Sequence, residues 1–143
     1  MRPNRSPTSR MPGVSPSLLW DVFKHVRAWL TNLNRAGEAR KTQSVKALRE
    51  VITAARETAV YMRQMQDLGT RDHGSERRLT VLWTELGFAL RDLGLNKLAK
   101  RCQITGKDWA KPGHYDKDFL EKADVSLERM EHLALEILHQ IDR

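Results

Sequence analysis

The chain has 143 residues, 40% hydrophobic and 30% charged, with a formal net charge of +7 at pH 7. This length fits one domain with a core of its own. A single cysteine excludes an internal disulfide framework, and no run of about 20 apolar residues predicts a membrane span. We therefore expect a cytoplasmic protein.

The first 15 residues differ in composition from the rest of the chain. They hold three of the five prolines, several serines and no acidic residue. Such a segment cannot bury enough apolar surface to offset its ordering entropy. We predict a disordered, basic tail at 1–15 and a single helical-bundle domain at 16–143.

Two long helices are predicted in the first half of the domain. Ser15 and Pro16 form a helix start, and apolar residues follow at helical spacing to about residue 35. Gly37 gives a turn. A second helix over 38–68 carries apolar residues three and four apart, namely Val45, Leu48, Ile52, Ala55, Ala59 and Met62.

Three more helices are predicted in the second half. The first is capped by Ser75 and ends at Gly94, and the second is a short helix over 95–105, capped by Asn96 and ended by Gly106. The last helix follows its cap at Asp116 and runs to about 141. No strand pattern occurs.

These elements predict an all-α fold. Four long apolar stripes joined by short connections are typical of an antiparallel four-helix bundle. We expect the short extra helix at 95–105 to pack across one end of that bundle.

Charge is distributed unevenly along the chain. Residues 1–111 contain 21 Lys and Arg against 10 Asp and Glu, whereas residues 112–143 contain 4 against 8. A basic body favours association with phosphate backbones or other acidic surfaces. The alternative is that net charge only keeps the protein in solution.

A first candidate binding feature is a row of arginines in the second helix. Arg49, Arg56 and Arg63 recur every seven residues, about 10.5 Å apart along the axis. Guanidinium groups at this spacing can follow a phosphate backbone. The alternative is flanking charge at helix edges, paired with Glu50 and Glu57 or with the acidic last helix.

The segment 97–111 is the second candidate. Only Asp108 opposes its cations, and the tryptophan adds a flat ring on which a base can stack. The alternative is that the tryptophan plugs the end of the bundle. The candidate nucleic-acid-binding residues here are Lys97, Lys100, Arg101, Lys107, Trp109 and Lys111.

Some apolar residues are left over after one core is filled. Val81 and Phe88 lie off the main stripe of their helix, and Trp20 lies off the stripe of the first helix. Exposed apolar lines commonly mark a partner surface or an oligomer seam. The alternative is that the third helix is central and buried on both sides.

No catalytic or metal-ligating set is predicted. Glu136 and His139 have the spacing used in di-metal bundles, but with His132 they lie opposite the apolar stripe and point to solvent. Cys102 lies among apolar neighbours and is interpreted as a buried residue. We predict no cofactor, no metal site and no catalytic residue.

The sequence therefore favours a non-enzymatic accessory or assembly protein. It would bind DNA or RNA, mostly through backbone contacts, and also a protein partner or a second copy of itself. The first alternative is a pure protein–protein interaction or homo-oligomeric subunit, and the second is a small metal-dependent helical-bundle enzyme.

Overall fold

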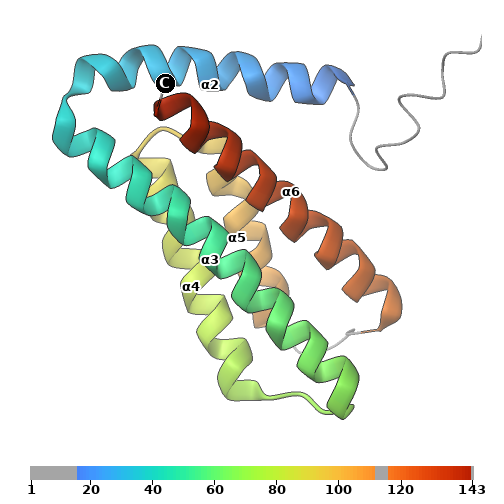
Figure 1. The fold of residues 1–143 in the computed structure, drawn as a ribbon. Helices are drawn as coiled ribbons and strands as arrows, with labels where there is room; N and C mark the ends of the chain where they lie inside the picture. The colour runs from blue at the N-terminus through green and yellow to red at the C-terminus, as the bar shows by residue number, and fades with distance from the viewer. Residues whose placement is uncertain (1–15, 112–115, 143) are drawn as a thin grey trace, which may run out of the picture.

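The computed structural model describes residues 16–111 and 116–142, with side chains from residue 25 onward. These residues form five helices and contain no strand (Figure 1). The helices are α2 (Pro16–Ala36), α3 (Glu38–Leu68), α4 (His73–Asp92), α5 (Asn96–Ala110) and α6 (Lys117–Ile141). The predicted all-α fold is confirmed, whereas the predicted tail at 1–15 lies outside the described residues.

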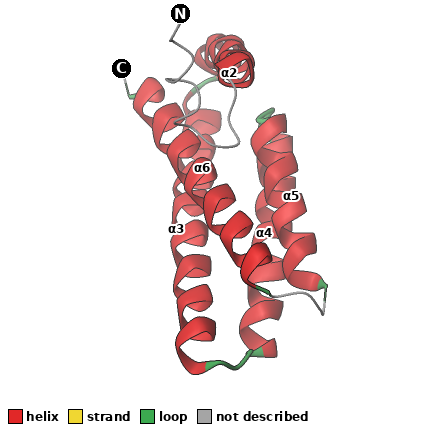
Figure 2. Ribbon diagram, turned by 90° about the vertical axis from the view of Figure 1, so that its right-hand side faces the viewer, coloured by secondary structure: helices red, strands yellow, loops and turns green. Residues whose placement is uncertain are grey.

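Helices α3, α4, α5 and α6 form the bundle, and α2 lies across one of its ends (Figures 1 and 2). α3 packs against both α4 and α6, and α5 packs along α4. The prediction that the helix after Gly94 crosses the bundle end was therefore wrong. That helix runs beside α4 as a hairpin partner, and the crossing helix is α2.

α5 is longer than predicted, because Gly106 does not end it. Gly106 is buried inside the helix, where it faces α4. A Cβ at this position would lie 2.6 Å from Thr84 Oγ1. The absent side chain allows the two helices to approach closely, and this packing outweighs the helix-propensity cost of glycine, about 1 kcal/mol.

Two of the predicted helix caps were also wrong. The carboxylate of Asp72, not Ser75, caps α4 by accepting from the Ser75 backbone nitrogen at 3.2 Å. α5 has Leu95 at its N-cap, with no side-chain cap hydrogen bond, rather than Asn96. The cap at Asp116 is confirmed, since its carboxylate accepts from the Phe119 nitrogen at 2.9 Å.

The core is centred on Trp83 of α4, which is fully buried. Its indole Nε1 donates to Thr58 Oγ1 at 2.9 Å, and the Thr58 hydroxyl donates to the Ala54 carbonyl at 2.7 Å. The indole nitrogen of Trp83 and the hydroxyl of Thr58 therefore both have hydrogen-bond partners, which avoids the cost of an unsatisfied buried group. Trp83 belongs to one core cluster that also contains buried aliphatic side chains from α3, α4, α5 and α6.

Side chains from α2 and α3 cap the C-terminal end of α4. Trp29 Nε1 of α2 donates to the Leu93 carbonyl at 2.7 Å, and Arg40 Nη2 of α3 donates to the Asp92 carbonyl at 2.9 Å. Gly94 then turns the chain with φ of 86°. Because carbonyls at a helix end lack partners within the helix, both bonds satisfy them, and the bond from Trp29 holds α2 across the bundle end.

Candidate nucleic-acid interface

α5 separates into an inward apolar face and an outward basic face. Leu98, Ala99, Cys102, Thr105, Gly106 and Trp109 are all buried. At 100° per residue, the remaining face extends about 21 Å from residue 97 to residue 111. We call it the α5 basic face; its members are all exposed and are Lys97, Lys100, Arg101, Ile104, Lys107 and Lys111.

The charge of the α5 basic face is largely uncompensated. Lys97, Lys100, Arg101 and Lys107 form no ion pair with any residue in the described ranges. Asp108 is the only acidic residue in the sequence of α5, and it is half-buried. Burial raises the pKa of its carboxyl, while the charge of Lys111 opposes that shift. The face therefore keeps a clear excess of positive charge.

Trp109 does not belong to this surface, and its predicted stacking role was wrong. It is 3% exposed. Its ring meets Tyr61 of α3 edge-on at a centroid distance of 5.7 Å and Phe119 of α6 at 5.8 Å. The alternative interpretation holds, since the ring fills the bundle interior where three helices meet. No base can stack on it in this conformation.

The arginine row of α3 is exposed but lies beside acidic groups. Arg56 Nη2 contacts Glu131 Oε2 of α6 at 2.9 Å, which also raises the pKa of the guanidinium. The alternative interpretation therefore holds for Arg56, whose charge is directed at the last helix. Arg49 and Arg63 are exposed and form no ion pair with described residues.

The two predicted basic features do not form one surface. The arginine row borders α6, as the contact between Arg56 and Glu131 shows. α5 packs along α4 instead, and α3 lies in front of both helices in Figure 1. A straight nucleic-acid strand lying along α5 would not reach the arginine row.

The predicted apolar line on α4 is exposed. Val81 is 47% and Phe88 54% exposed, so the alternative that this helix is buried on both sides was wrong. Their role as a partner surface stays a prediction. The side chain of Trp20, the third predicted partner-binding residue, lies outside the described side chains.

Sequence reasoning missed a buried polar cluster where α4 begins. The Glu76 carboxylate is 6% exposed and accepts from Arg71 Nη2 at 2.8 Å, Arg71 Nε at 2.9 Å and the Tyr61 hydroxyl at 2.8 Å. The hydrogen bonds from Arg71 lower the pKa of Glu76 despite its burial. No spacing signal marks the cluster, because Tyr61 comes from a different helix. It fixes the loop between α3 and α4.

The remaining reactive groups do not converge. His132 and His139 are exposed and Glu136 is half-buried, all on α6. Within the described ranges no three His, Cys, Asp or Glu residues lie close enough to hold a metal ion. Cys102 is fully buried, as predicted, and burial raises the pKa of its thiol to about 12.

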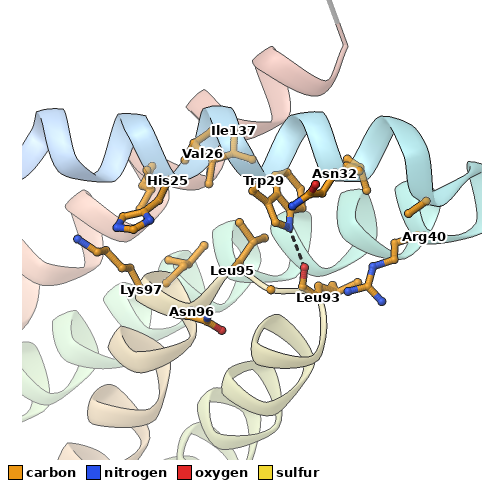
Figure 3. A pocket seen from close by; sticks show the side chains of 15 residues that line it. His25, Val26, Trp29, Asn32, Arg40, Leu93, Leu95, Asn96, Lys97 and Ile137 are labelled. Carbon is orange, nitrogen blue, oxygen red and sulfur yellow. Dashed lines mark hydrogen bonds between the residues drawn. The ribbon is translucent and has the colours of Figure 1, made fainter.

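A cavity of about 480 Å³ lies where α2 crosses the turn between α4 and α5. Figure 3 shows His25 and Lys97 at one side of it and Trp29 bonded to the Leu93 carbonyl at the other. The wall between them is mainly aliphatic and includes Leu95 and residues of α6.

None of the described helices has the length and apolar composition that crossing a membrane requires. Comparisons with protein-family models, curated proteins and solved structures give no match to this chain. The class is therefore defined by the structure itself: an all-α protein, whose described residues form a four-helix bundle with a fifth helix across its end.

Proposed function

We propose that this protein is a non-enzymatic accessory module, acting in the cytoplasm, that binds nucleic acid through the α5 basic face. One observation carries the proposal: five exposed cations share one helical face about 21 Å long with a single, half-buried carboxylate. Lys and Arg side chains that approach phosphates release condensed counterions, and this release drives binding without reference to sequence.

The expected mode of binding is backbone contact with little base recognition. Phosphates would meet Lys97, Lys100 and Arg101 near the start of α5 and the other two lysines near its end. With Trp109 buried, the face offers no aromatic ring for stacking. Ile104, 41% exposed, adds apolar contact at the middle of the face.

Salt dependence of binding tests this proposal. Fluorescence anisotropy of labelled 20-nucleotide single strands and 20-base-pair duplexes, of DNA and of RNA, is measured from 20 to 200 mM salt. The logarithm of affinity should fall linearly with the logarithm of salt concentration, by about 0.9 per phosphate contact on duplex DNA. We expect the Lys100→Gln, Arg101→Gln variant to lose most of two such contacts from the slope.

A variant with the same loss of charge on another helix is the control. Lys117 and Lys122 are exposed residues of α6, and Lys122 pairs with Asp118 at 3.2 Å. Changing both lysines to glutamine should alter the slope far less. No binding to any of the four nucleic acids at 20 mM salt, or equal slopes for the two variants, would refute the proposal.

A further inference from the structure

Two pairs of exposed apolar side chains lie on different sides of the bundle. Val81 and Phe88 form the α4 apolar pair, and Val125 and Leu135 of α6 are 42% and 45% exposed. α3 packs against both helices and lies between them, with α4 behind it and α6 beside it in Figure 1. Neither pair is therefore able to cover the other within one chain.

Cations border the α4 apolar pair on the side of α5. Gly87 faces Ala99 and Gln103, and Gly106 faces Thr80 and Thr84, so the hairpin is antiparallel. This register sets Phe88 level with Lys100 and Val81 level with Lys107. Arg91 also lies at this edge, because its Nη2 donates to Gln103 Oε1 at 2.8 Å. Glu85 and Asp92 lie toward the opposite edge, on the α3 side.

The apolar pair on α6 lies among carboxylates. Lys117 and His132 lie on the outer side of α6 as well. At 100° per residue, Glu121, Asp124, Val125, Glu128 and Leu135 share this side, away from the buried stripe of α6, so carboxylates outnumber cations there. All five are exposed, and their spacing of three, four and seven residues makes a second amphipathic line. We call this set the α6 outer stripe. Its charge is opposite to that of the edge shared by α4 and α5.

We propose that the α6 outer stripe of one copy docks on the α4 apolar pair and its bordering cations in a second copy, a surface we call the α4–α5 face. Val125 and Leu135 would then pack against Val81 and Phe88. The three carboxylates would then face Arg91, Lys100 and Lys107. Burial of the four apolar side chains stabilises the contact, and the opposite charges set its orientation.

This contact joins two different surfaces, so a pair of copies keeps one free surface of each kind, one on each copy. A heterologous contact of this type builds rings when its rotation closes and open chains when it does not. The inference does not depend on nucleic-acid binding, although the two share Lys100 and Lys107. Tests through the apolar side chains therefore leave every cation of the α5 basic face in place.

Sedimentation velocity on two complementary variants tests the contact. Variant one carries Val81→Ser and Phe88→Ser, and variant two carries Val125→Ser and Leu135→Ser. At 50 mM salt the wild-type mass should rise with concentration to at least twice the 16.5 kDa of the chain. Each variant alone should stay at the mass of one chain. An equimolar mixture should form a species of two chains and nothing larger, because each variant retains one working surface.

A third variant supplies the matched control. Val60→Ser and Leu68→Ser remove two exposed apolar side chains of α3, which are 48% and 72% exposed, and should leave assembly unchanged. A wild-type chain that stays single at every concentration overturns the proposal. So does assembly that survives in variant two but not in variant one, since the α4 face would then pair with something other than α6. Nucleic-acid binding should persist in all three variants, because none of them changes a cation of the α5 basic face. A failure of the assembly proposal is therefore distinguishable from a failure of the nucleic-acid proposal.

Discussion

Gly106 of α5 and Thr84 of α4 lie so close that a Cβ on the glycine would be 2.6 Å from the threonine Oγ1 and 3.2 Å from its backbone nitrogen. Gly87 makes the reciprocal approach, since a Cβ there would lie 2.5 Å from Gln103 Cγ and 3.2 Å from the Ala99 carbonyl oxygen. One glycine from each helix therefore brings the hairpin together. This approach makes the outer faces of α4 and α5 one continuous surface.

We expect Gly106→Val to lower the free energy of unfolding by about 2 kcal/mol, because overpacking a tight contact costs roughly 1–3 kcal/mol. Gly74→Ala is the control: its Cβ would lie 3.8 Å from Asp72 Oδ1, an ordinary contact, and its stability should be equal or slightly higher. Urea unfolding followed by circular dichroism measures both. Equal midpoints for Gly106→Val and the wild type would contradict the close approach.

The helices themselves could be predicted because apolar periodicity reflects burial directly. Leu48 and Met62 of the predicted heptad stripe are buried, whereas Val45 and Ile52 are only half-buried. The core of α3 is displaced toward Val51, because this helix packs against α4 as well as α6. A single helix carries no information on how its two neighbours divide its surface.

The error at Trp109 follows from the error at the end of α5. If the helix stops at Gly106, Trp109 is a loop residue free to face solvent. Because the helix continues to Ala110, Trp109 falls seven residues after Cys102, on the same inward face. Sequence rules treat Gly106 as a helix terminator because glycine is common at helix C-termini. In the structure, contact with α4 keeps Gly106 in the helix. The contact between Arg56 and Glu131, 75 residues apart, likewise depends on tertiary structure alone.

The Glu76 cluster should make a measurable contribution to stability. Glu76→Gln removes the charge that accepts two hydrogen bonds from Arg71, and we expect a loss of about 2 kcal/mol in the free energy of unfolding. Glu85→Gln, on an exposed carboxylate of the same helix, should change stability by less than about 0.5 kcal/mol. Urea titration at pH 7 compares the two, and equal losses would contradict a specific role for the cluster.

The same carboxylate predicts a pH dependence. Hydrogen bonds from Arg71 lower the folded-state pKa of Glu76 below its ordinary value of 4.5. The stabilisation is therefore complete above pH 4.5 and is lost as the pH falls through the folded-state pKa. The groups that face the carboxylate are Arg71, Tyr61 and His73, whose Nδ1 is 3.6 Å away. Below pH 4.5, the wild type should lose stability more steeply than Glu76→Gln; parallel curves would contradict this.

The thiol of Cys102 should react with thiol reagents only when α5 unfolds or separates from the bundle. Its thiol is fully buried and its pKa is about 12, so little thiolate forms near pH 8. We expect its reaction with a disulfide reagent to be at least about a thousandfold slower than that of an exposed thiol introduced by Ile104→Cys. The rate should increase with urea concentration in parallel with unfolding. Rapid reaction in the native wild type would show that α5 opens readily.

The arginine row and the α5 basic face should differ in their effect on nucleic-acid affinity, even for equal changes in charge. Arg49→Gln with Arg63→Gln removes two positive charges, as does Lys100→Gln with Arg101→Gln. We expect the first variant to change the salt slope less than half as much, because the carboxylate of Glu131 lies within this row. Glu131→Gln should leave the affinity nearly unchanged, because a strand lying along α5 does not reach Arg56. Anisotropy titrations on duplex DNA measure all three variants. A larger effect from the Arg49→Gln, Arg63→Gln variant would show that nucleic acid binds to α3 and not to α5.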